Sequence, residues 1–196
     1  MGSCRQPVPG PRGESNAALE PPRRGWRWSL GADALGAQGI APGLVFTVPL
    51  FVELANVTDA PLAFDVRLRF SHAGTGAAPV TGGALDFTWT AGSLDVCPLA
   101  WSPGRARFVA CARGEAGVLD ASGVNILPAR SDARPWLTAG LALRAQYALV
   151  GPLFVELEPS AFAPIIRDRF YFEPSITAFR APAVAFEGAA GVGASF

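Results

Sequence analysis

Strict alternation of apolar and polar residues constrains this chain more than any other feature of its sequence. In the stretch PLAFDVRLRFS, residues 61–71, one face of an extended strand would carry Leu62, Phe64, Val66, Leu68 and Phe70. The opposite face would carry Ala63, Asp65, Arg67, Arg69 and Ser71. Because successive side chains of a strand point to opposite faces, such a strand is stable only between an apolar and a polar environment.

The same period of two recurs along the chain and predicts an all-β fold. Clusters of Gly, Pro, Asn and Asp separate the alternating segments, and no helical period stands out. We predict eight strands, at residues 26–37, 43–56, 61–72, 83–100, 106–119, 135–149, 153–163 and 179–196. Each has at least roughly the 9 to 11 residues that a tilted strand needs to cross a bilayer.

The connections between these segments alternate in length. Tight turns are expected at 56–61, 102–105 and 150–152, and longer loops near 72–83, 120–135 and 163–178; the first connection, 38–42, is short. Short turns at one end and long loops at the other are typical of an up-and-down barrel with two unlike rims. The pattern therefore predicts an eight-stranded antiparallel transmembrane β-barrel.

Composition supports a non-aqueous neighbour and limits the domain organisation. Charged residues make up 16% of the chain, against about 25% in an average soluble domain. No apolar run of 18 residues is present, which excludes a transmembrane helix. Residues 1–24 are rich in Pro, Gly and Arg and lack a recognisable secretory signal, so we expect a disordered leader or linker there and the barrel domain at 25–196.

The polar face of the strands combines small residues with charges of both signs. Small side chains leave room inside a narrow barrel, and opposite charges can neutralise each other there. We therefore expect a plugged, salt-bridged lumen formed by Arg27, Asp33, Glu53, Asp65, Arg67, Arg69, Asp86, Arg107, Arg113, Glu115, Arg144, Glu156, Glu158 and Glu187. Aromatic residues near strand ends, such as Trp26, Trp28 and Trp101, fit the interfacial belts of a membrane barrel.

The last segment, VAFEGAAGVGASF, alternates in the same way and ends in an aromatic residue. Here the chain resembles the small eight-stranded outer-membrane barrels of Gram-negative bacteria, such as the OmpA transmembrane domain and OmpX. The resemblance implies short periplasmic turns, an outer-membrane location in contact with its lipid, and an assembly signal at Val184, Phe186, Val192 and Phe196 that the outer-membrane assembly machinery reads. The sequence departs from the family pattern at a bulge-like break near Gly92 and Ser93.

Two cysteines flank the turn at 102–105 almost symmetrically. Cys97 and Cys111 would lie opposite each other on adjacent antiparallel strands, which predicts a disulfide and an oxidising compartment; the alternative is two buried free thiols. Cys4 remains as a free thiol in the leader. With one His and no paired-cysteine ligand spacing, we expect no metal and no other cofactor.

The sequence offers little for catalysis or for nucleic-acid binding. Ser71 and His72, the only His, are neighbours in a predicted strand and would point to opposite faces, which is poor geometry for a nucleophile and its base. Sixteen basic residues balance sixteen acidic ones, which argues against a nucleic-acid footprint. We therefore expect a non-enzymatic protein.

The resulting hypothesis is a monomeric outer-membrane barrel with a structural or adhesive role, exerted through extracellular loops on an unidentified partner. Two alternatives remain open from the sequence. A soluble lipocalin-like carrier would have the same alternation with its apolar face inside. A lipid-A-modifying outer-membrane enzyme would need a Ser, a His and an acid converging at one rim.

Overall fold

The computed structural model describes residues 25–41, 43–57, 63–80, 83–124, 131–166, 169–172, 176–180 and 182–196. The predicted leader, residues 1–24, lies outside this part of the chain. The strands are β1 (Gly25–Gln38), β2 (Val45–Thr47), β3 (Leu50–Val57), β4 (Asp65–Val80), β5 (Gly83–Trp101), β6 (Ala106–Val124), β7 (Ser131–Ala148), β8 (Leu153–Pro164), β9 (Arg169–Phe172), β10 (Ile176–Arg180) and β11 (Ala185–Ser195). No helix in the described residues is long and apolar enough to span a membrane.

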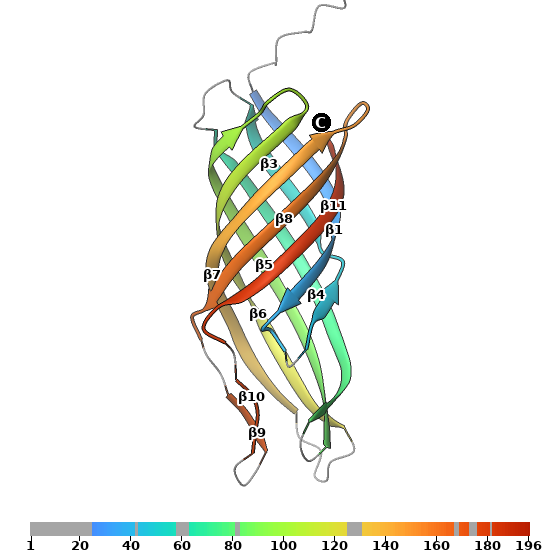
Figure 1. Cartoon of the computed structure of the whole chain (residues 1–196), viewed down its shortest axis with the longest axis vertical. Helices are drawn as coiled ribbons and strands as arrows, with labels where there is room; N and C mark the ends of the chain where they lie inside the picture. The colour runs from blue at the N-terminus through green and yellow to red at the C-terminus, as the bar shows by residue number, and fades with distance from the viewer. Residues whose placement is uncertain are drawn as a thin grey trace, which may run out of the picture.

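Eight of these strands form a closed antiparallel barrel (Figure 1). The ladder runs β1–β3–β4–β5–β6–β7–β8–β11, and pairing of β11 with β1, from Ser29 opposite Ser195 to Gln38 opposite Phe186, closes the ring. Each strand neighbours the next along the chain, so the topology is up-and-down. The predicted fold class, an all-β eight-stranded antiparallel barrel, is confirmed.

The predicted second strand is interrupted rather than continuous. β2 pairs with β1 opposite Leu35–Ala37, and β3 resumes that pairing from Leu50 opposite Ala32. Pro49 lies between the two strands, and its carbonyl accepts a hydrogen bond from the backbone N–H of Asp33 at 3.0 Å. Because proline has no N–H to donate, it fits best at such a break in a ladder.

Two tight turns, one between β5 and β6 and one between β7 and β8, join strands at the rim where β1 begins and the chain ends, which we call the turn end (Figure 1). They contain Gly104 and Gly151 at φ of 64° and 61°. Glycine adopts this left-handed conformation without steric cost, which permits these short turns.

The opposite rim, the loop end, differs from the sequence prediction. Residues 73–80, 120–124 and 131–134, expected in loops, continue β4, β6 and β7, which have 16, 19 and 18 residues, against 11 in β11. β9 and β10, expected within a loop and at the start of the last strand, form a separate hairpin. β4 to β7 and this hairpin therefore extend below the shorter strands in Figure 1.

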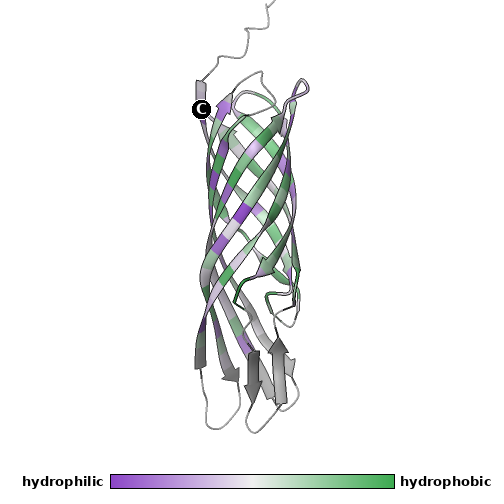
Figure 2. Cartoon of the chain, turned by 90° about the vertical axis from the view of Figure 1, so that its left-hand side faces the viewer, coloured by the Kyte–Doolittle hydropathy of each residue, from purple (hydrophilic) through white to green (hydrophobic). Residues whose placement is uncertain are grey.

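The outer wall is apolar and the interior is polar. Large hydrophobic side chains remain exposed around the ring, with Phe46, Val48 and Leu141 about 70% exposed. Figure 2 shows the resulting alternation of hydrophilic and hydrophobic residues along the strands. Exposed aromatic residues gather near the turn end, at Trp26, Trp28, Phe64, Trp101, Phe108, Tyr147 and Phe196.

Candidate functional site

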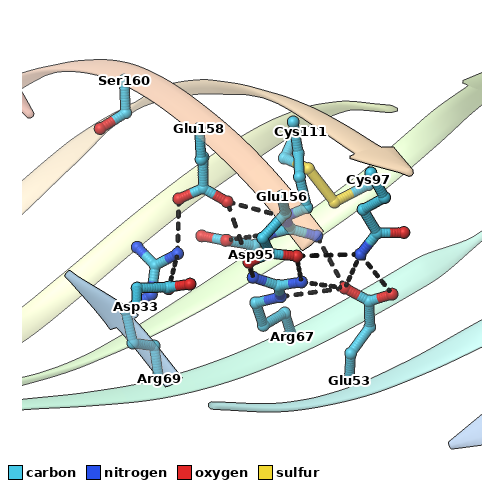
Figure 3. A network of polar contacts seen from close by, with 12 residues as sticks. Asp33, Glu53, Arg67, Arg69, Asp95, Cys97, Cys111, Glu156, Glu158 and Ser160 are labelled. Carbon is cyan, nitrogen blue, oxygen red and sulfur yellow. Dashed lines mark hydrogen bonds and ion pairs between the residues drawn. A yellow bond between two sulfur atoms is a disulfide. The ribbon is translucent and has the colours of Figure 1, made fainter. Parts of the chain in front are cut away.

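Alternation along the strands directs a set of charged side chains into the lumen, where they form one connected network (Figure 3). Arg67 of β4 is fully buried and donates from Nε and Nη2 to Glu53 Oε2 of β3, at 2.9 and 2.7 Å. Its Nη1 and Nη2 also donate to Glu156 of β8. The guanidinium carbon lies 3.8 Å from the ring centroid of Phe51, so the cation also stacks on an aromatic face.

Arg144 of β7 connects three acids that lie on different strands. It donates to Glu158 Oε2 at 2.7 Å, to Glu53 Oε2 at 2.9 Å and to Asp95 Oδ2 at 2.8 Å. Because the acids come from β8, β3 and β5, this one guanidinium links opposite parts of the wall. Hydrogen bonds between ionised groups are roughly twice as strong as neutral ones.

Arg113 of β6 continues the network toward the loop end. It binds Asp95 with two parallel hydrogen bonds of 2.7 and 2.8 Å, and it also donates to Glu158 and, at 3.2 Å, to Glu187. Glu158 is therefore shared, because Arg69 of β4 donates to its Oε1 at 2.6 Å. The same Arg69 nitrogen lies 3.1 Å from Asp33 of β1.

Four further charged residues lie at the margins of this network. Near the turn end, Arg107 Nη2 donates to both oxygens of Asp65 at 2.7 Å, and Arg27 is half-buried on β1. On the loop side, Glu115 accepts a hydrogen bond of 2.6 Å from the indole N–H of Trp136. Thirteen of the fourteen predicted lumen residues therefore lie on the inward face.

Asp86 is the exception, and Asp95, which the sequence analysis did not include, is the inward acid of β5. Phe87 and Trp89 are buried, so Asp86 lies at an outward position and is half-buried. The sequence suggested a break near Gly92 and Ser93, but the β4–β5 and β5–β6 registers are continuous through those residues.

The break in β5 lies closer to the turn end. In the β5–β6 ladder, Val96 pairs with Ala112 and Leu99 with Ala110, so Cys97 and Pro98 together oppose Cys111. The inward positions change parity there, from Cys97 to Ala100. Two residues opposite one define a β-bulge, and Pro98, which cannot donate to the ladder, was the local signal for it.

An apolar layer fills the lumen next to the charged network on the loop side. It contains the aromatic side chains of Phe87, Trp89, Trp136 and Phe162, together with Leu35, Ile40, Val45 and Leu119. Trp89 is 1% exposed, and the ring of Trp136 packs edge-on against that of Phe162 at 6.3 Å between centroids. In the described part of the chain, the lumen therefore contains a charged middle and an apolar section toward the loop end.

The remaining predicted residues have these positions. Cys97 and Cys111 are joined by a disulfide on the inward face, beside the charged network (Figure 3). Val184, Phe186, Val192 and Phe196 are 50 to 72% exposed on the outer face in and beside β11. The described residues contain no group of three or more metal-ligating side chains.

Ser71 and His72 lie on opposite faces of β4, as their adjacency predicts. Ser71 is 3% exposed in the lumen, whereas the exposed His72 ring shares a 2.8 Å hydrogen bond with Thr90 on the outer face. The two side chains therefore do not form a nucleophile and base pair.

Comparisons with known proteins show likeness in structure only. No protein-family model matches the chain, and no curated protein matches it significantly. A major outer membrane protein from Thermus thermophilus superposes with a TM-score of 0.66 at 15% identity, covering 88% of this chain and 100% of that one. Ail, the attachment invasion locus protein of Yersinia pestis, superposes at 0.57 and 10% identity, covering 88% and 99%. The chain thus has the fold of the small eight-stranded outer-membrane β-barrels.

Proposed function

We propose that the chain is a non-enzymatic β-barrel of a Gram-negative outer membrane, with a closed lumen and with its loop end facing the exterior. The observation that carries the proposal is the polarity of the closed ring, which has buried ion pairs inside and large exposed hydrophobic residues outside. Water cannot stabilise that outer wall, whereas lipid can.

The exposed hydrophobic residues argue for lipid around the wall. Monomeric soluble proteins rarely expose contiguous apolar patches larger than a few hundred Å², yet Leu30, Leu68, Leu94, Leu141 and Leu157, on five different strands, are each 44 to 69% exposed. A soluble lipocalin-like carrier would require the inverse arrangement, with an apolar interior. The polarity of this barrel contradicts that alternative.

The side chains that fill the lumen support a closed barrel. Eight strands leave an interior just wide enough for side chains, and Arg67, Arg113 and Arg144 each bind acids on at least two other strands. The apolar layer around Trp89 and Trp136 forms a second barrier on the loop side. We infer that ions do not pass through the resting barrel.

The loop end supports a role in surface contacts. Strands β4 to β7 continue past the shorter strands there, and this end also carries the β9–β10 hairpin. Ail of Yersinia pestis has been crystallised with the heparin analogue sucrose octasulfate, in a structure that superposes with a TM-score of 0.53 at 10% identity. By analogy, we infer that the loop end contacts an extracellular partner.

The pairing and the exposed residues of the last strand are evidence for a barrel that closes as a monomer and is assembled in the outer membrane. β11 pairs on both edges, with β8 and β1, so no open strand edge remains at the closure. Phe186 and Val192 of this strand and Phe196 directly after it present an exposed apolar row. We infer that the outer-membrane assembly machinery reads this row before β11 closes the ring.

Epitope insertion into intact cells tests location and orientation together. One tag is inserted after Leu127, between β6 and β7, and a matched tag after Gly104, in the turn at the opposite rim. Both chains are given an export signal and expressed in a Gram-negative bacterium. The proposal expects both in the outer-membrane fraction, with antibody binding to intact cells for the first tag only. Inner-membrane or soluble protein, or labelling of the Gly104 tag on intact cells, would contradict it.

Measurements of ion current across a lipid bilayer test the closed lumen separately. The purified barrel is reconstituted into planar lipid bilayers, and insertion is verified by quantifying protein in the bilayer-forming vesicles. We expect no stable conductance steps. Reproducible steps in the unmodified protein would contradict a closed lumen while leaving the outer-membrane location intact.

A further inference from the structure

The disulfide is enclosed within the wall of the folded barrel. Cys97 is 0% and Cys111 3% exposed, and both side chains point inward. The apolar residues Ala63, Ala100, Val109 and Ala142 pack around them in one buried cluster. Neither sulfur is therefore accessible from the lipid side or from water around the turn end.

Ion pairs close the lumen on both sides of the disulfide. Toward the loop end, Arg113 binds Asp95 through two hydrogen bonds across the same pair of strands, two residues from each cysteine. Toward the turn end, Arg107 binds both oxygens of Asp65, which is the cross-strand partner of Cys97. A reagent that approaches along the barrel axis must displace one of these pairs.

The same two cysteines can meet without the rest of the barrel. They lie 14 residues apart on the hairpin of β5 and β6, on either side of the turn at 102–105. The β5–β6 ladder alone places them opposite each other. Their pairing therefore needs one local hairpin, whereas their burial also needs Ala63 before β4, Asp65 of β4 and Ala142 of β7.

From this geometry we propose that a dithiol-oxidising enzyme forms the Cys97–Cys111 disulfide on the unclosed chain, before β11 pairs with β1. One cysteine thiolate attacks the disulfide of the enzyme and forms a mixed disulfide. The second cysteine thiolate then attacks this bond and releases the enzyme as a dithiol. The two cysteines lose two electrons and two protons overall, which the enzyme disulfide takes up. Each attack requires a sulfur to approach a sulfur directly, which the closed barrel prevents.

This order means that the disulfide can form before the barrel closes and cannot be exchanged afterwards while the barrel stays folded. While the hairpin is open, the thiols react with any oxidant of this class. After closure, neither oxidants nor reductants reach the sulfur atoms until the barrel unfolds. The inference does not depend on which membrane holds the barrel, so its test is independent of the proposed function.

Rates of thiol oxidation in the open and closed chain test this order. The full chain with Cys4→Ser is reduced, then either kept in urea or folded in detergent micelles under reductant. After the reductant is removed, oxidised glutathione is added, and free thiols are counted by maleimide mass shift after denaturation. We expect the folded chain to oxidise at least a hundredfold more slowly than the chain in urea. A difference of less than tenfold would overturn the proposal.

A second measurement applies even if the reduced chain folds poorly. The oxidised barrel is treated with dithiothreitol, either folded in micelles or unfolded in urea. We expect the folded barrel to be reduced at least a hundredfold more slowly than the unfolded chain, and a difference of less than tenfold would overturn the proposal. As a control for reagent access, Arg105→Cys is introduced into a chain without other cysteines. Arg105 is exposed in the turn, so this thiol should react with maleimide at similar rates in the folded and unfolded chain.

Discussion

Replacing Arg144 by methionine should destabilise the barrel strongly. Arg144 is 1% exposed, and its guanidinium donates to three carboxylates, Glu53, Asp95 and Glu158, at 2.7 to 2.9 Å. Methionine keeps an unbranched apolar side chain and carries no charge, so the substitution removes the ion pairs and leaves the space of the guanidinium group unfilled. The three acids then remain buried with fewer positive neighbours.

The expected loss follows from the charge balance of the lumen. Among the described residues, the buried arginines are Arg67, Arg69, Arg107, Arg113 and Arg144, and the buried acids are Asp33, Glu53, Asp65, Asp95, Glu115, Glu156, Glu158 and Glu187. Acids are in excess, so an arginine cannot be lost without leaving carboxylates less neutralised. Removing one partner of a buried pair costs about 3–5 kcal/mol. Since 1.4 kcal/mol is a factor of ten, the folding equilibrium constant should fall roughly a hundredfold to a few thousandfold.

Reversible urea unfolding in lipid vesicles, followed by tryptophan fluorescence and by mobility of unboiled samples on gels, measures this loss. Leu143→Met is the matched control, because Leu143 is adjacent and 60% exposed on the outer face, and it should cost less than about 1 kcal/mol. Glu187→Gln should also cost less than Arg144→Met, because it reduces the acid excess. If Arg144→Met lost no more stability than Leu143→Met, the reasoning about the charged lumen would be refuted.

Three further substitutions probe other parts of the structure. Leu141→Arg should cost about 2–4 kcal/mol in unfolding experiments in vesicles, because Leu141 faces outward well inside the apolar band. Joint replacement of Cys97 and Cys111 by alanine should lower unfolding stability by about 2–3 kcal/mol, since the bond closes a short loop of the chain. Phe196→Ala should slow assembly by the outer-membrane machinery several-fold while changing the stability of the folded barrel little.

Each of these substitutions has a control on the same barrel. Val150→Arg, at the tip of a turn where Val150 is 81% exposed, should cost only about 0–1 kcal/mol, and equal losses at both sites would contradict a lipid-facing band. Cys4→Ser should leave stability unchanged. Phe46 is 70% exposed on the outer wall, close to the 72% of Phe196, so equal assembly rates of Phe46→Ala and Phe196→Ala would contradict a terminal signal.

Alternation made most of the barrel predictable from the sequence. A strand buried on one face has a period of two, and its register fixes every side chain at once, so Asp65, Arg67 and Arg69 could be assigned to the lumen from one short stretch. Opposite charges on these faces also indicated ion pairing. Which arginine binds which acid depends on the stagger of eight strands, and no local pattern encodes that.

The errors have local physical causes. A bulge changes the parity of a strand, and the sequence suggested one near Gly92 and Ser93, whereas the ladder has it at Cys97 and Pro98. Without a break at Gly92, the alternation runs uninterrupted from Phe87 to Cys97, which turns Asp95 inward and Asp86 outward. The strands at the loop end were predicted too short, because residues 73–80 are small and resemble a loop in composition. There the ladder with β5 holds the backbone, through a register shift between Gly74 and Ala77.

The central claim, a barrel with lipid outside and paired charges inside, is tested most directly by folding the full chain with and without a bilayer. The chain is diluted from urea into buffer alone or into lipid vesicles, and boiled and unboiled samples are compared by gel mobility and circular dichroism. We predict a fast-migrating, heat-modifiable β-structured species that forms only with lipid. A stable, monomeric β-protein in lipid-free buffer would contradict the account.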